Sequence, residues 1–175
     1  RRLTAEEIRD SLLFLSDSLD RTPGGSTSNS YGQDLDKPIV FDDYNIRTVY
    51  LPVARNNLAV ELSVFDAANP DLVSGRRAET TVPTQALYLL NSEFIHERAS
   101  IIGRMALEAG VNPGEEVDWL YQTLLGRAPN PVEKQRALAF LADLSGGSEA
   151  RDALEAASGH LAHVILASTE FLFLN

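Results

Sequence analysis

Helix-starting signals recur along this chain, and each is followed by apolar residues at helical spacing. Thr4 and Glu7 form a T-x-x-E capping box, and the next apolar residues lie three or four positions apart: Ile8, Leu12, Leu15 and Leu19. The segment 130–133, Asn-Pro-Val-Glu, places a cap, a first-turn proline and an acid at the start of another helix, expected to reach about Leu144. With about 60% of residues in such patterns, the sequence predicts a mainly α fold, a helical bundle.

The same periodicity predicts three further helices. Pro83 suits the first turn of a helical stretch that should continue to Gly110. Two more helices are expected over about Val117–Leu125 and over about 150–171. The expected core face of the stretch that begins at Pro83 consists of Leu87, Leu90, Phe94, Ile95, Ile102 and Met105.

The end of the chain is unusually apolar. Residues 171–174 read Phe-Leu-Phe-Leu, a sequence unsuited to a free tail. We therefore expect Phe171 and at least one neighbouring leucine to pack into the bundle.

The middle of the chain lacks the helical pattern. Residues 21–30 are rich in glycine and serine, which predicts a loop. Two short β-prone runs, 39–41 and 49–51, flank a turn signal and predict one small hairpin, while a short helix is expected to follow Asn57. The sequence thus predicts one domain over residues 1–175, with a loop- and hairpin-bearing insertion at about 21–82.

Composition excludes several classes of function. Fifteen Lys and Arg against 25 Asp and Glu give a net charge of −10, which argues against nucleic acid and anionic membranes as partners. No apolar run is long enough for a membrane span. The absence of Cys excludes disulfides, thiol nucleophiles, Cys-type zinc sites and covalent haem attachment. Because the chain starts Arg-Arg-Leu-Thr, without Met or an apolar signal region, we expect a fragment of a larger protein.

The histidines and acids offer no complete metal site, so we predict neither a metal nor a cofactor. Glu93-x-x-His96 has the spacing of one helical ligand pair but lacks a second pair. His96 is expected on a helix surface, and His160 with His163 at a helix–helix seam. Four acids in the middle segment do not follow the calcium-loop spacing and are read as a solvated loop: Asp34, Asp36, Asp42 and Asp43.

No catalytic residue can be assigned from the sequence. The chain has no Gly-x-Ser-x-Gly elbow, no phosphate-binding loop and no dinucleotide-binding glycine pattern. With 25 acids, a general acid–base pair stays open.

A group of arginines in the non-helical middle is the main candidate for binding. Arg47, Arg55, Arg76 and Arg77 can hold an anionic or partner group, since guanidinium groups bind carboxylate and phosphate through paired hydrogen bonds. The alternative is structural, with these arginines tying loops to nearby acids. Because adjacent residues of an extended loop face opposite sides, we expect one of Arg76 and Arg77 to clamp the loop and the other to face solvent.

Several motifs along the chain fit one family pattern: Arg1 to Asp10, Val49 to Val53, Arg55-Asn56, Phe65-Asp66, Asn69-Pro70, Gly75-Arg76-Arg77, Thr80 to Leu87, Leu89 to Ser92 and Tyr121 to Pro129. Through these motifs the chain resembles the planctomycete-specific C-terminal domain, of unknown function, of large proteins that often also carry a cytochrome-c-like domain.

The C-terminal part contains Tyr121-x-x-Leu-Leu-Gly-Arg127-x-Pro129 and Ser168-x-Glu170-Phe171. Through these two pieces it also resembles phycobilisome-linker-like helical modules.

These resemblances imply a role in assembly. We predict a non-catalytic interaction or scaffolding domain of a large exported bacterial protein, periplasmic or otherwise exported by resemblance alone. Its expected partners are the neighbouring domains of the parent protein, a cytochrome-c-like domain among them. The alternative is an accessory part of a redox or polysaccharide-acting enzyme whose cofactor and main catalytic groups lie in other domains.

Overall fold

Helices form most of the chain, as the sequence predicts. The computed structural model describes residues 1–22, 44–51, 58–69, 71, 73, 75, 77–110 and 112–174. The chain divides into two compact units, residues 2–88 and residues 89–175 together with Arg1, called here the N-terminal and the C-terminal unit. Each unit is described by itself, so a single domain over 1–175 stays a prediction.

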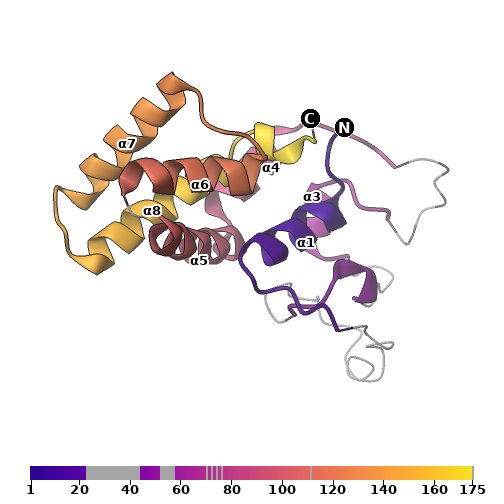
Figure 1. Ribbon diagram of the computed structural model, residues 1–175. Coiled ribbons are helices and arrows are strands. Elements are labelled where there is room, and N and C mark those ends of the chain that lie inside the picture. Colours follow the sequence, from indigo (N-terminus) through magenta and orange to yellow (C-terminus); the bar gives the residue numbers. More distant parts are fainter. Residues whose placement is uncertain are drawn as a thin grey trace. The chain divides into compact units, whose positions relative to one another are not determined.

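The N-terminal unit contains α1 (Ala5–Leu15), the 3-10 turn η2 (Thr48–Tyr50), α3 (Val60–Val64) and most of α4 (Pro83–Asn91) (Figure 1). The predicted capping box begins α1: the Thr4 hydroxyl accepts from the Glu7 amide at 3.3 Å, and the Glu7 carboxylate accepts from the Thr4 amide at 2.9 Å. The buried apolar side chains of the unit include Ile8, Leu12, Leu13, Leu62 and Phe65.

The predicted hairpin is wrong at its second strand. Residues 48–50 form η2 instead, because the Asp10 carboxylate accepts from the Thr48 amide at 2.8 Å and from its hydroxyl at 2.6 Å. These bonds hold the start of the turn against α1. The first predicted strand, 39–41, lies outside the described residues. Within the described residues, the structure shows an isolated β-bridge between Asp20 and Ile46.

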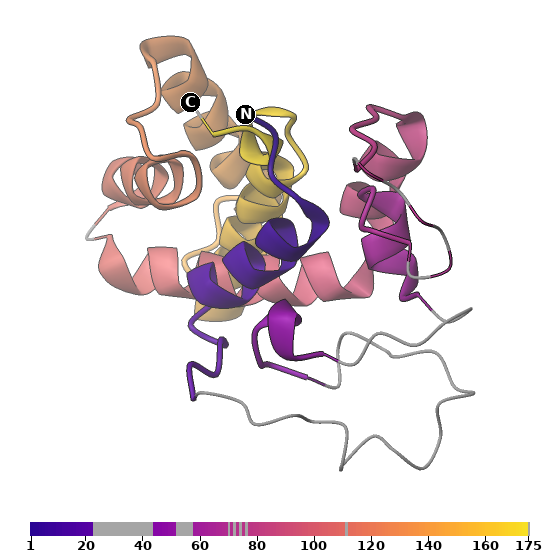
Figure 2. The same cartoon turned by 90° about the vertical axis from the view of Figure 1, so that its right-hand side faces the viewer.

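The C-terminal unit is a bundle built from α5 (Glu93–Ala109), α6 (Pro113–Leu125), α7 (Pro131–Ser145), α8 (Arg151–Leu166) and the short turn η3 (Glu170–Leu172). Helix α8 packs against α5 and α7, and α6 packs against both α5 and α7 (Figures 1 and 2). The fully buried side chains at the centre include Ile95, Ile102, Val117, Leu120 and Leu166.

Two glycines allow α5 and α8 to approach closely. A Cβ atom placed on Gly103 would collide with the backbone nitrogen of Gly159, because the two atoms would lie closer than non-bonded atoms can approach. A Cβ atom on Gly159 would lie 3.3 Å from the Cα of Ser100. The two helices can therefore cross at this distance only because residue 103 is a glycine and has no side chain.

The stretch predicted as one helix from Pro83 to Gly110 is interrupted. Ser92, with φ −69° and ψ 128°, is extended and separates α4 from α5. The break changes the register, so that Leu89 is buried whereas Leu87 and Leu90 are half exposed. Gly110 ends α5, as the sequence predicts.

The remaining helices begin at their predicted signals or near them. Asn130 caps α7 as predicted, and Glu133 completes a capping box with it; Gly126 ends α6 with a positive φ of 70°. Helix α6 starts earlier than predicted, because Asn112 accepts from the amides of Gly114 and Glu115.

The C-terminal segment partly follows the prediction. Helix α8 ends at Leu166, short of the predicted Phe171, and the chain then forms η3. Phe171 and Leu172 are buried, which confirms that the apolar end packs into the bundle, whereas Phe173 and Leu174 are about half exposed. No helix in the described part of the chain combines the length and apolarity that a membrane crossing requires.

Candidate functional site

Two of the four candidate arginines lie within the described residues, and both pair with α1. Arg77 Nη1 donates to Glu6 Oε2 at 2.8 Å, and Arg47 Nε lies 3.7 Å from Asp10 Oδ2. Burial is the largest influence on the pKa of Glu6 and raises it, but the hydrogen bond and charge of Arg77, together with hydrogen bonds from Thr4 and the Glu6 backbone, bring the pKa below its usual value. The two arginine side chains stay 46% and 57% exposed, so both reach solvent beside α1.

Arg76 and Arg55 lie outside the described residues, so the expected difference between Arg76 and Arg77 stays a prediction. Arg77 is half exposed, and its carboxylate partner Glu6 belongs to α1. Arg77 therefore reaches solvent and also ties its segment to α1.

A buried arginine missed by the sequence analysis holds the middle segment on α1. Arg9 is 2% exposed and donates to the carbonyl oxygens of Ile46, at 2.8 Å, and of Tyr44, and to the Thr48 hydroxyl at 3.2 Å. Its position could have been read from the sequence, because Arg9 precedes Leu12 and Leu13 by one helical turn and so shares their buried face.

Asp66 connects the end of α3 to the segment around Thr80 in the N-terminal unit. Its backbone has a positive φ of 62°, which costs energy for a residue other than glycine. The carboxylate accepts from the Thr80 amide at 2.8 Å, from the Thr80 hydroxyl at 2.9 Å and from Arg2 Nη1 at 3.0 Å. Burial raises the pKa of Asp66, but these hydrogen bonds outweigh it and lower the pKa overall. Phe65-Asp66 and Thr80-Thr81, two pieces of the recognised motif, are thus joined directly.

Two histidines contact backbone carbonyl groups at the C-terminal end of α4. The rings of His96 and His163 lie with centroids 4.1 Å apart, and their Nε2 atoms contact the carbonyl oxygens of Leu90 at 3.2 Å and Leu89 at 2.9 Å. A carbonyl only accepts, so each Nε2 carries the proton. The histidines thereby satisfy carbonyls at the helix terminus.

The expectations for the histidines hold in part. His96 is exposed, as predicted, and His163 is buried at a helix contact, but His160 is exposed rather than paired with it at a seam. Among the described residues, no group of three or more His, Cys, Asp or Glu is arranged to hold a metal ion. The four acids of the middle segment, residues 34–43, lie outside them.

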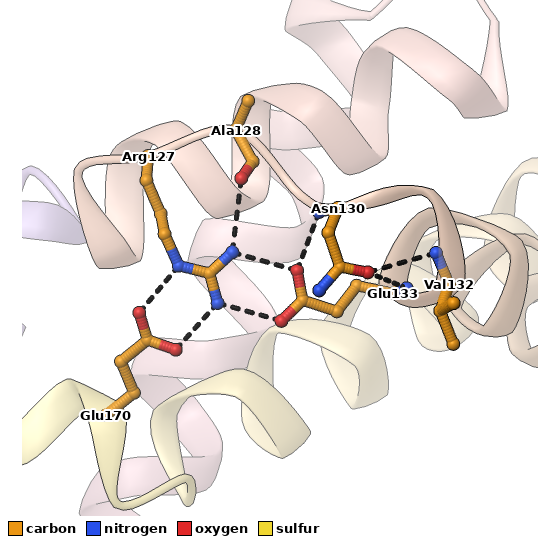
Figure 3. Close-up of polar contacts among 6 residues, drawn as sticks. All are labelled: Arg127, Ala128, Asn130, Val132, Glu133 and Glu170. Atoms are coloured by element: carbon orange, nitrogen blue, oxygen red, sulfur yellow. Dashed lines mark hydrogen bonds and ion pairs between the residues drawn. The ribbon is translucent and has the colours of Figure 1, made fainter.

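Arg127 is the centre of a polar cluster in the C-terminal unit (Figure 3). Its Nε and Nη2 donate to the two carboxylate oxygens of Glu170 at 2.6 and 2.7 Å. Its Nη1 and Nη2 donate to the two oxygens of Glu133, both at 2.8 Å, and Nη1 also donates to the Ala128 carbonyl at 3.1 Å. Since a guanidinium has five N–H groups, every donor of Arg127 is used.

The cluster is connected to the start of α7. Glu133 also accepts from the Asn130 amide at 2.7 Å, as part of the capping box. The hydrogen bonds from Arg127 and from Asn130 lower the pKa of Glu133 to about 2. The hydrogen bond from Arg127 likewise lowers the pKa of Glu170, and the Arg127 guanidinium lies 5.5 Å from the centre of the Tyr121 ring. Burial, followed by the charge of Glu133, raises the pKa of Tyr121.

This cluster unites the two pieces of the C-terminal motif. Tyr121 and Arg127 belong to the piece 121–129, and Glu170 belongs to the piece 168–171. Both pieces can be read from the sequence as parts of one pattern, but the pairing of their charged residues cannot. Arg127 is one positive charge between two carboxylates, so the cluster is saturated and has no free donor for an external anion.

Residues 1–141 match the family described as PSD1, protein of unknown function (DUF1553). No curated protein and no solved structure matches the chain significantly. The family match spans the N-terminal unit and the C-terminal unit into α7, including Tyr121, Arg127 and Glu133. On this match, the chain belongs to the PSD1 family of proteins of unknown function.

Proposed function

We propose that this chain is a non-catalytic interaction or scaffolding domain of a larger exported bacterial protein. Its partners are neighbouring domains of the same polypeptide, with a cytochrome-c-like domain the first to be tested. The proposal is supported by what the charged residues of the recognised motifs do in the structure. Arg127 and Asp66 make hydrogen bonds that join segments distant in sequence. Side chains used in this way build a fixed shape, which suits a domain that others dock against.

The surface proposed for docking includes the candidate arginines. Arg47 and Arg77 are about half exposed, and each has one carboxylate of α1 beside it. Exposed pairs of this kind are weak, so a carboxylate on a partner can compete for the guanidinium groups. We propose the same role for Arg55 and Arg76, which belong to the same part of the sequence.

The experiment measures binding between the chain and the cytochrome-c-like domain of its parent protein. Biolayer interferometry should show binding that weakens as salt is raised, because charge pairs at a surface are screened. The double variant Arg47→Ala/Arg77→Ala should bind about tenfold more weakly. Arg151→Ala is the matched control, because Arg151 is also an exposed arginine, paired with Glu108 and Glu155, in the C-terminal unit.

Two results would contradict the proposal. The first is the absence of binding to any neighbouring domain of the parent protein. The second is an equal loss of affinity in the double variant and in Arg151→Ala, which would place the effect in overall charge rather than at these arginines. Cell fractionation of the source organism tests export separately, since the parent protein should be found outside the cytoplasm.

A further inference from the structure

A cavity of about 250 Å³ lies among α6, α7 and α8 in the C-terminal unit. Its wall is mainly apolar, and hydroxyl groups of three serines and the carboxyl group of Glu116 interrupt it. The apolar part of the wall comes from Pro113, Leu138, Leu141, Ala142, Leu154 and Ala157.

Glu116 is an unusual group for such a wall. It is 4% exposed, and its Oε1 lies 2.5 Å from the hydroxyl oxygen of Ser158. Among the described residues, no arginine, lysine or histidine lines the cavity. A carboxylate buried without a cation is costly, so this carboxyl group lacks the partner that its charged form requires.

The hydrogen bonds around Ser158 show how a protonated Glu116 avoids this cost. The Ser158 hydroxyl is also 2.8 Å from the Leu154 carbonyl, but a hydroxyl has one proton and can donate to one of these acceptors at a time. When Glu116 is protonated, it donates to Ser158, and Ser158 donates to Leu154. Burial favours this state, since it raises the pKa of Glu116, an effect that the hydrogen bond from Ser158 only partly offsets.

We propose that this cavity binds a small primary amine with an apolar body, whose ammonium group pairs with Glu116. A cavity of roughly 150 Å³ accepts benzene, so the larger volume here accommodates one ring with a short arm. The ammonium supplies the cation that the buried carboxylate lacks, and the leucines and alanines of the wall cover the apolar body. An anionic ligand is disfavoured, because among the described residues the wall holds no arginine, lysine or histidine to pair with its charge.

The surrounding charge favours the same class of ligand. Residues 89–175 contain 12 acidic and 6 basic side chains, a balance that attracts cations to this unit. This attraction is general, however, so specificity has to come from the single buried carboxyl group. The binding site also differs from the proposed docking arginines, which belong to the N-terminal unit.

The test uses benzylamine, benzyl alcohol and benzoate as probes of one shape and three charges. Two-dimensional NMR of the chain should show that benzylamine shifts the amide signals of Leu141, Ala142 and Ala157, while benzoate shifts none. Glu116→Gln keeps the shape of the side chain and removes its charge. It should weaken benzylamine at least tenfold and change the affinity for benzyl alcohol less than twofold.

Two further variants keep the result interpretable. Glu115→Gln makes the same change in net charge at an exposed neighbouring residue and should leave the benzylamine affinity within twofold. Ala142→Phe fills the cavity from an exposed wall position, so it should abolish binding without unfolding the chain. The proposal is overturned if benzylamine leaves the wall signals unshifted, binds Glu116→Gln as tightly as the unaltered chain, or still binds Ala142→Phe.

Discussion

Arg127 and Glu170, which lie 43 residues apart in sequence, form a bidentate ion pair with donor–acceptor distances of 2.6 and 2.7 Å. The same guanidinium pairs in the same manner with Glu133. Because Glu170 belongs to η3 and Glu133 to α7, Arg127 holds the C-terminal segment to the start of α7 (Figure 3). The charged residues of the C-terminal motif thus have a structural explanation.

Replacing Arg127 by glutamine should lower the free energy of unfolding by about 1–2 kcal/mol, a figure reduced for partial exposure. Urea denaturation followed by circular dichroism measures the change. Glu170→Gln should cost less, because Arg127 keeps Glu133. A double-mutant cycle should show clear coupling between the two positions. Additive effects would mean that the pair contributes nothing to folding.

The same cluster should make stability depend on acid. The pKa values of Glu133, at about 2, and of Glu170 lie below the usual 4.5 in the folded state. Their stabilisation is therefore complete above pH 4.5 and is lost as the pH falls toward 2. The difference in unfolding free energy between the unaltered chain and Arg127→Gln should shrink over this range. A difference that stays constant from pH 6 to pH 2.5 would contradict this assignment.

Gly103→Ala should be strongly destabilising, by about 3 kcal/mol, because the new methyl group would collide with the backbone of Gly159. Thermal unfolding should show a clearly lower midpoint. Gly75→Ala is the matched control, since a Cβ atom there meets nothing within 4 Å. A similar midpoint for both variants would show that α5 and α8 can separate at little cost.

Arg9→Ala should cost about 3 kcal/mol, because it leaves two partly buried carbonyl groups, those of residues 44 and 46, without their donor. Arg77→Ala should cost at most about 1 kcal/mol, since its pair with Glu6 is half exposed. Chemical denaturation of the two variants makes the comparison. Equal and small losses would show that the segment 44–51 is not held by Arg9.

Local signals in the sequence determined where several helices begin and end. The Thr4–Glu7 capping box, the Asn130 cap and the terminating glycines at 110 and 126 all act within a few residues of backbone. Their hydrogen bonds form wherever the segment lies in the fold, so sequence alone is enough to identify them. The apolar end at Phe171 was equally readable, because burial of a large aromatic side chain follows from its hydrophobicity.

Tertiary structure decided which of the polar residues meet. The break at Ser92 turned Leu89 inward and Leu87 outward, and η2 replaced a strand because Asp10 of α1 accepts from Thr48. Arg9, Arg77 and Arg127 each have a partner 35 to 71 residues away in sequence, and Arg127 also pairs with Glu133, 6 residues along the chain. No local pattern records such pairings, because a charged side chain takes whichever opposite charge or carbonyl group the packed helices bring within reach.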